Sequence, residues 1–251
     1  MKQPIISILF FFLVSLTLTA QYQSAIASFD KVIVSPHIAV KFQQGAKNQI
    51  QVESITVNEN KLHVEVEGKT LRVYLEGAKE YTKNEKQYEN GHKKSKPLYH
   101  GTVVKATITY QAFDEVSLRG EERFDFLSPI NQNDLRLKIY GESQVYFHEV
   151  NLKKLQTTIY GQSVLEFMAG HVVDQKFTAY GESNVNALNI KNQNTKLTAY
   201  GEGSYQFNVS EKLKVTAYGE ATVVYKGTAE LSKGIVIGDA EIAKLTINSN
   251  D

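Results

Sequence analysis

Five tyrosines recur in the second half of the chain, and each is followed by glycine. They stand 18 to 20 residues apart, at Tyr140, Tyr160, Tyr180, Tyr200 and Tyr218. If each interval is one turn of a repeating structure, the five side chains form a single column. Such a column predicts a recognition surface, because tyrosine is favoured at interfaces and its ring can stack on a sugar or rest against a protein. The alternative interpretation is structural, with rings that only close a corner of the fold.

The position after each glycine forms a second column, which holds Glu142, Gln162, Glu182, Glu202 and Glu220. Carboxylates one turn apart, such as Glu182 and Glu202, would have the separation of about 5 Å that retaining glycosidases use. Stacked carboxylates could also bind calcium weakly. Both uses are disfavoured, because an active site is an exception within a repeat and this column is the repeat itself. We therefore predict no catalytic residue, no metal site and no cofactor, and we place Glu182, Glu202 and Glu220 with the tyrosines in one binding face.

A third column is basic and lies four residues before the tyrosines, at Arg136, Lys176, Lys196 and Lys214. We interpret it as a solvated face that could meet acidic glycans. The six histidines are scattered without the spacing of metal ligands. The serines that follow several corners have no histidine partner for a hydrolase triad.

The elements that would position these columns are strands. Glycines recur from Gly120 to Gly238 at intervals of 18 to 21 residues, and stretches such as LRLKIY and LKVTAY alternate apolar and polar residues. Such alternation, rich in Thr, Val, Tyr and Ile, is typical of strands, and a repeat near 20 residues is typical of a solenoid. The sequence therefore predicts an all-β fold, a right-handed parallel β-helix with about 20 residues per coil.

The alternation also assigns the faces. Residues one, three and five before each tyrosine are mostly apolar and should point inward, whereas the tyrosines, the threonines and the basic column should point outward. A small inward residue follows each corner, at Ser143, Ser163, Ser183, Gly203 and Ala221. Glycine permits a tight corner because it adopts backbone angles that a Cβ atom forbids.

The chain is predicted to contain one domain behind a signal peptide. Residues 1–20 combine a short basic start, an apolar run and small residues at the end, which is typical of a cleaved secretory signal. Residues 21–251 should form a single β-helix domain, with degenerate N-terminal coils over 29–113 and regular repeats over 114–242. The polar stretch 79–101 is predicted to be a mobile loop inserted between the degenerate coils. We expect an extracytoplasmic protein (periplasmic, outer-membrane-associated or secreted) without a transmembrane segment in the mature chain.

Composition disfavours several classes of function. The 251 residues carry 28 Lys and Arg against 27 Asp and Glu, and loss of Lys2 with the signal peptide leaves a neutral chain. A neutral chain without a basic block is a poor nucleic-acid binder. The absence of Cys excludes thiolate zinc sites and a lipid-modified N-terminal Cys.

Three stretches carry a resemblance to a known family: FDKVIVSPHIAVKFQQG with IQVES, then TLRVYLEG, then ITYQAFDEVSLRGEERF leading into the repeated corners. From Phe29 to Leu245 the chain resembles the bacterial "putative auto-transporter adhesin, head GIN domain" family. The resemblance implies a right-handed parallel β-helix exported by a Bacteroidota-like bacterium, with no established activity. The sequence departs from the family pattern at its corners, where tyrosine stands before glycine in place of a small residue.

These observations predict an exported, non-enzymatic, adhesin-like binding module that recognises a cell-surface glycan or protein through its Tyr/Thr/Glu face. The alternative hypothesis is a polysaccharide-processing enzyme on the same scaffold, by analogy with other β-helices. An enzyme should show a groove where non-repeating charged residues converge, whereas a binding module should show a flat repetitive strip. No feature of the sequence indicates how many copies of the chain associate.

Overall fold

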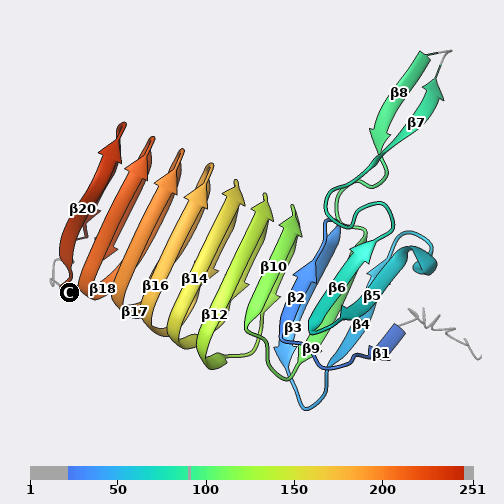
Figure 1. Ribbon diagram of the computed structural model, residues 1–251, viewed down its shortest axis with the longest axis horizontal. Coiled ribbons are helices and arrows are strands. Elements are labelled where there is room, and N and C mark those ends of the chain that lie inside the picture. Colours follow the sequence, from blue (N-terminus) through green and yellow to red (C-terminus); the bar gives the residue numbers. More distant parts are fainter. Residues whose placement is uncertain (1–21, 90–91, 246–251) are drawn as a thin grey trace, which may run out of the picture.

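The computed structural model describes residues 22–89 and 92–245, and the secondary structure within these ranges is almost entirely β. A single turn of 3-10 helix, η1 (Glu59–Lys61), interrupts it. Figure 1 shows the strands from β10 to β20 stacked side by side along the long axis of the molecule. Successive coils pair in parallel, so the predicted parallel β-helix is confirmed.

The first wall of the solenoid consists of parallel strands in register. Each coil places a residue opposite the same repeat position of the coil before, as with Tyr140 and Tyr160. The strands of this wall are β10 (Glu115–Gly120), β12 (Ile130–Gly141), β14 (Val150–Gly161), β16 (Gly170–Tyr180), β17 (Ser183–Tyr200), β18 (Gly203–Tyr218) and β20 (Glu230–Ile237).

The second wall is built in the same way from the strands that follow each glycine corner. These strands also pair in parallel, and the N-terminal ends of β17 and β18 belong to this wall. Its other members are β11 (Arg123–Phe126), β13 (Gln144–Phe147), β15 (Val164–Phe167), β19 (Ala221–Lys226) and β21 (Glu241–Lys244).

The N-terminal strands extend both walls, but not in chain order. A coil made of β2 (Lys31–Val34) and β3 (Ile38–Gln44) pairs in parallel with β10 and β11 on one side. On its other side the coil pairs in parallel with β6 (Thr70–Leu75) and β9 (Val104–Tyr110). Antiparallel strands then cover this end of the solenoid, namely β5 (Leu62–Glu67), β4 (Gln49–Ile55) and β1 (Tyr22–Ala25).

The degenerate coils expected over 29–113 therefore contain strands, but they do not follow one another as simple coils. The coil of β2 and β3 comes first in the chain but is stacked between two coils that come later, and antiparallel strands cover the end. Strand-like residues do not by themselves specify which neighbour a strand pairs with, so this order could not be read from the sequence.

The stretch 79–101, expected to be a loop, contains a hairpin. Strands β7 (Asn84–Glu89) and β8 (His92–Pro97) pair antiparallel as a separate two-stranded sheet. Figure 1 shows this hairpin projecting from the N-terminal part of the solenoid. The loop is therefore corrected to a hairpin, and its polar residues lack the apolar face by which a strand is usually recognised.

The core lies between the walls, and the predicted inward columns are buried. Leu135, Leu137 and Ile139 are at most 2% exposed, and the equivalent residues of later coils are buried as well. A column of phenylalanines stacks along the second wall with ring centroids 4.1 to 5.1 Å apart, at Phe42, Phe126, Phe147 and Phe167.

The corner between the walls explains why a glycine follows each of the five tyrosines. Gly161 has a φ of +118°, and a Cβ atom there would lie 2.2 Å from the carbonyl oxygen of Gly141 in the preceding coil. Ser163 is fully buried, and its hydroxyl donates to that same carbonyl at 2.9 Å. From Gly141 onward, each corner glycine thus packs against the glycine of the coil before, where a side chain would push the coils apart.

Candidate recognition face

The structure places the five tyrosines of the repeat in one stacked column, the tyrosine ladder (Tyr140, Tyr160, Tyr180, Tyr200 and Tyr218). Neighbouring ring centroids are 4.8 to 5.1 Å apart and the ring planes are within 6° of parallel. The side chains point outward, and Tyr160, Tyr180 and Tyr200 remain 41%, 38% and 37% exposed. The ladder arises because parallel strands in register repeat every side chain at the strand spacing.

This stacking decides which part of each tyrosine is available to a ligand. In the middle of the ladder both faces of a ring are covered by the neighbouring rings, at 4.8 Å on each side of Tyr180. No sugar ring fits between them, so stacking of a sugar on these faces, one mode expected from the sequence, is not available. The ring edges and hydroxyl groups are what the ladder presents.

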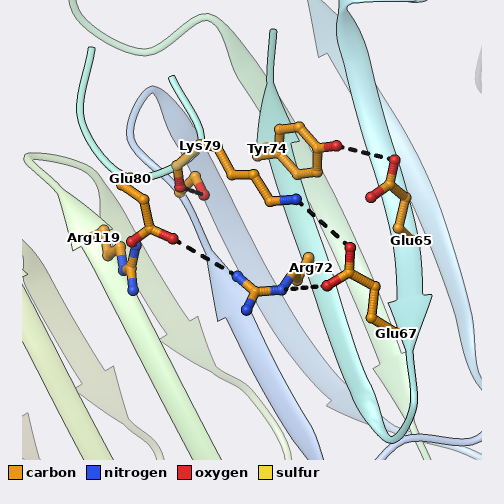
Figure 2. A network of polar contacts seen from close by, with 8 residues as sticks. Glu65, Glu67, Arg72, Tyr74, Lys79, Glu80 and Arg119 are labelled. Atoms are coloured by element: carbon orange, nitrogen blue, oxygen red, sulfur yellow. Dashed lines mark hydrogen bonds and ion pairs between the residues drawn. The ribbon is translucent and has the colours of Figure 1, made fainter. Parts of the chain in front are cut away.

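The ladder ends at a cation on its N-terminal side. The guanidinium carbon of Arg119 lies 5.6 Å from the ring centroid of Tyr140, one coil away on β10. Arg119 forms an ion pair with Glu80, which also lies 3.8 Å from Arg72. Figure 2 shows how Arg72 links this pair to Glu67, at 3.1 Å. The first tyrosine is therefore covered by a cation held in an ionic network.

A sixth tyrosine continues the same line beyond this network, outside the repeats that the sequence revealed. Tyr74 on β6 stacks on His63 with centroids 4.8 Å apart, and the ammonium of Lys79 lies 4.5 Å from its ring centroid. Its hydroxyl donates to Glu65 at 3.0 Å (Figure 2). Burial and this hydrogen bond raise the pKa of Tyr74. Only its position one before the end of a strand, as for Tyr140 and Tyr160, could have signalled it.

The glutamate column flanks the ladder and is open to solvent. Glu142, Glu182, Glu202 and Glu220 are all exposed. The amide of Gln162 donates to Glu182 at 3.1 Å, so the one neutral member of the column relieves the repulsion between carboxylates. Within the described residues, no group of three or more acidic or histidine side chains is placed to hold a metal ion.

One acidic residue breaks the repeat and lies inside the fold. Glu122 occupies the corner position that serine holds in the next three coils, and it is only 3% exposed. Its carboxylate accepts a hydrogen bond from the backbone N–H of Glu121 at 3.0 Å. Burial raises the pKa of Glu122. The carboxylate of Glu122 faces backbone N–H donors. We therefore infer that Glu122 has a structural role and stabilises the corner beside His37, whose φ is +71°.

Comparisons with solved structures show the same fold. A putative adhesin from Bacteroides fragilis NCTC 9343 has a TM-score of 0.71 at 18% identity, and a putative adhesin from Parabacteroides merdae ATCC 43184 has 0.65 at 17%. A putative lipid binding protein from Parabacteroides distasonis ATCC 8503 has 0.64 at 18%. Each alignment covers 90% of this chain and 96% of the other. At these identities the likeness establishes the fold alone.

No curated protein matches the sequence. Across the described residues, no helix is both long enough and apolar enough to cross a membrane. Residues 28–229 match the family described as "Putative auto-transporter adhesin, head GIN domain", which is the family that the sequence resembled. Since the match spans more than half of the chain, the protein belongs to the putative auto-transporter adhesin, head GIN domain family.

Proposed function

We propose that this protein is an exported, non-enzymatic, adhesin-like module that contacts a partner at a cell surface through its tyrosine ladder and glutamate column. Membership of a family described as adhesins supports the class of function. The observation that carries the proposal is the ladder itself, five stacked aromatic rings in one continuous line, of which the central three are exposed. Exposed aromatic strips of this kind are typical of interaction sites.

The hydroxyl groups distinguish recognition from a purely structural ladder. Phenylalanine would stack equally well, yet all five positions are tyrosine. Among the described residues, none of the five hydroxyls has a hydrogen-bond partner within the protein. They form a row of free donors and acceptors at the strand spacing of about 4.8 Å. A partner that satisfies them would gain hydrogen bonds that the fold itself does not use.

The same geometry favours a protein partner over a glycan. Sugar recognition by aromatic rings uses ring faces, and here those faces cover one another. A protein surface can pack on the ring edges and hydrogen-bond to the hydroxyls and to the exposed glutamates. A glycan would depend on the hydrogen bonds alone.

The test replaces Tyr160, Tyr180 and Tyr200 together by phenylalanine, which keeps the stack and removes three hydroxyls. Binding of the mature protein is measured on intact cells, on protease-treated cells and on a glycan array. We expect at least a tenfold loss of binding to cells, and loss of wild-type binding after protease treatment. Tyr81→Phe, at an exposed tyrosine outside the ladder, is the matched control and should bind normally. Equal binding by the triple variant and wild type on every surface would refute the proposal.

Export is proposed on separate grounds. The family is described as adhesins, which act outside the cell, and residues 1–20 have the pattern of a secretory signal. The signal pattern lies outside the described residues. N-terminal sequencing of protein recovered from the periplasm, outer membrane and medium should give a chain that begins at Gln21. Recovery of a chain that still begins at Met1 from the cytoplasm alone would contradict export.

A further inference from the structure

A line of lysines crosses the same wall as the tyrosine ladder, at a separate place. Lys176, Lys196 and Lys214 face one another on successive strands. Together with Lys154 and Lys212 they line one groove, the lysine groove, in which Asp174 is the single acidic residue. The line lies four residues before the tyrosines, which corresponds to about 13 Å along a strand.

The three aligned lysines have no acidic residue opposite them on the neighbouring strands. Within the part of the chain that the structure describes, none of the five forms an ion pair. Asp174 is instead engaged by the amide of Asn194, at 2.9 Å. Like charges directly opposite on neighbouring strands destabilise a sheet, so this arrangement is costly without an anion.

In the first coils, the positive charge at the repeat position of the aligned lysines is neutralised by an acidic residue. Arg136 occupies the same repeat position as the three aligned lysines and lies 3.1 Å from Glu115. The same carboxylate also holds Lys138 at 2.8 Å and Lys31 at 2.9 Å. The column is therefore paired at Arg136, neutral at Gln156 in the next coil, and unpaired at the three aligned lysines.

We propose that the lysine groove binds an acidic polysaccharide, whose carboxylate or sulfate groups lie along the solenoid axis. Three aligned charges repeat at the strand spacing of about 4.8 Å, which suits an extended polyanion rather than a single ion. A row of threonines, two residues further along each strand, lies beside the charges and offers hydroxyls to sugar oxygens.

Other polyanions fit the groove less well. Its lining contains no aromatic side chain on which a nucleic-acid base could stack. The apolar residue that lines it, Leu155, is fully buried, so the rim has no side chain to insert among lipid chains. These features favour a soluble saccharide over single-stranded nucleic acid or a membrane.

The experiment uses the mature full-length protein and polygalacturonate, with dextran sulfate, neutral dextran, single-stranded DNA and anionic phosphatidylglycerol vesicles as comparison probes. Calorimetry at low and high NaCl should show binding to polygalacturonate that weakens with salt, and none to neutral dextran. The triple variant Lys176→Gln, Lys196→Gln and Lys214→Gln should lose at least tenfold in affinity. Its thermal midpoint should equal or exceed that of wild type, because the repulsion is removed.

The control variant replaces three exposed lysines far from the groove, Lys47, Lys83 and Lys244, with glutamine, which changes net charge by the same amount. It should bind polygalacturonate like wild type. Three results would overturn the proposal. They are an equal loss of affinity in the two lysine triple variants, binding of vesicles or DNA in preference to both acidic polysaccharides, and no binding of either acidic polysaccharide at low salt. The tyrosine-to-phenylalanine variant should bind polygalacturonate normally, so this test and the test of the tyrosine ladder fail independently.

Discussion

Replacement of Gly161 by alanine tests the physical reason for the repeated corner. The new Cβ atom would lie 2.2 Å from the carbonyl oxygen and 2.9 Å from the carbonyl carbon of Gly141. Both neighbours are backbone atoms of a strand that is hydrogen-bonded on both sides, so neither can move alone. The substitution therefore strains its own backbone and forces two coils apart.

The magnitude follows from these two effects. A residue with a side chain held at φ of +118° costs about 1–3 kcal/mol, and overpacking of a well-packed interior costs about 1–3 kcal/mol. Together we expect a loss of about 2–6 kcal/mol in the free energy of unfolding. For a chain of this size, that corresponds to a fall in Tm of roughly 4–24 °C.

Two further substitutions separate the contributions. Gly68 also has a positive φ, +61°, but nothing lies within 4 Å of a Cβ there, so Gly68→Ala should lose only about 1–2 kcal/mol. At Gly201 the nearest atom to a Cβ is the carbonyl oxygen of Gly181, at 2.9 Å, so Gly201→Ala should have an intermediate effect. Tm is measured by circular dichroism on the mature protein. Equal destabilisation at all three positions would refute contact between coils as the reason for glycine.

Three other substitutions have defined outcomes. Tyr180→Leu removes two stacked ring pairs and should lose about 1–3 kcal/mol in urea unfolding, whereas Tyr180→Phe should lie within about 0.5 kcal/mol of wild type. Ser163→Ala removes a buried hydrogen bond and should lose about 1 kcal/mol, measured in the same way. Burial acts to raise the pKa of Glu115, but hydrogen bonds from Lys138 and two other cations outweigh it and lower the pKa from 4.5 to about 2. The resulting stability is present above about pH 4.5 and is lost as pH falls toward 2. After allowance for solvent screening it amounts to about 1–2 kcal/mol, and Glu115→Gln should abolish this part of the acid dependence in Tm measured between pH 2 and 7.

The regular half of the fold could be predicted because its signal is repeated. The spacing of Gly141, Gly161 and Gly181 gives the coil length, and the alternation around them gives the inward and outward faces. Each coil confirms the register of the next, so an error in one unit would be visible against the others. The column of tyrosines followed from the same arithmetic.

The N-terminal half has no regular repeat against which the register of one strand could be compared with that of the next. Its strands are recognisable as strands, but β4, β5 and β1 are antiparallel and the coil of β2 and β3 lies between segments that come later in the chain. Partner choice there depends on which apolar faces meet at the end of the solenoid. For the same reason, the contacts of Arg119 and Tyr74 near the end of the ladder were not foreseen.

By itself, the sequence determined how the chain winds and which side chains recur on which face, because period and alternation are properties of neighbours along the chain. The tertiary structure alone decided that the tyrosine rings cover one another, that Lys154 and Lys212 join the aligned lysines in one groove, and that Glu115 neutralises the first coils but not the later ones. These outcomes depend on distances between coils. Hydrogen bonds between strands set that spacing at about 4.8 Å, which brings rings into contact and leaves unpaired charges side by side.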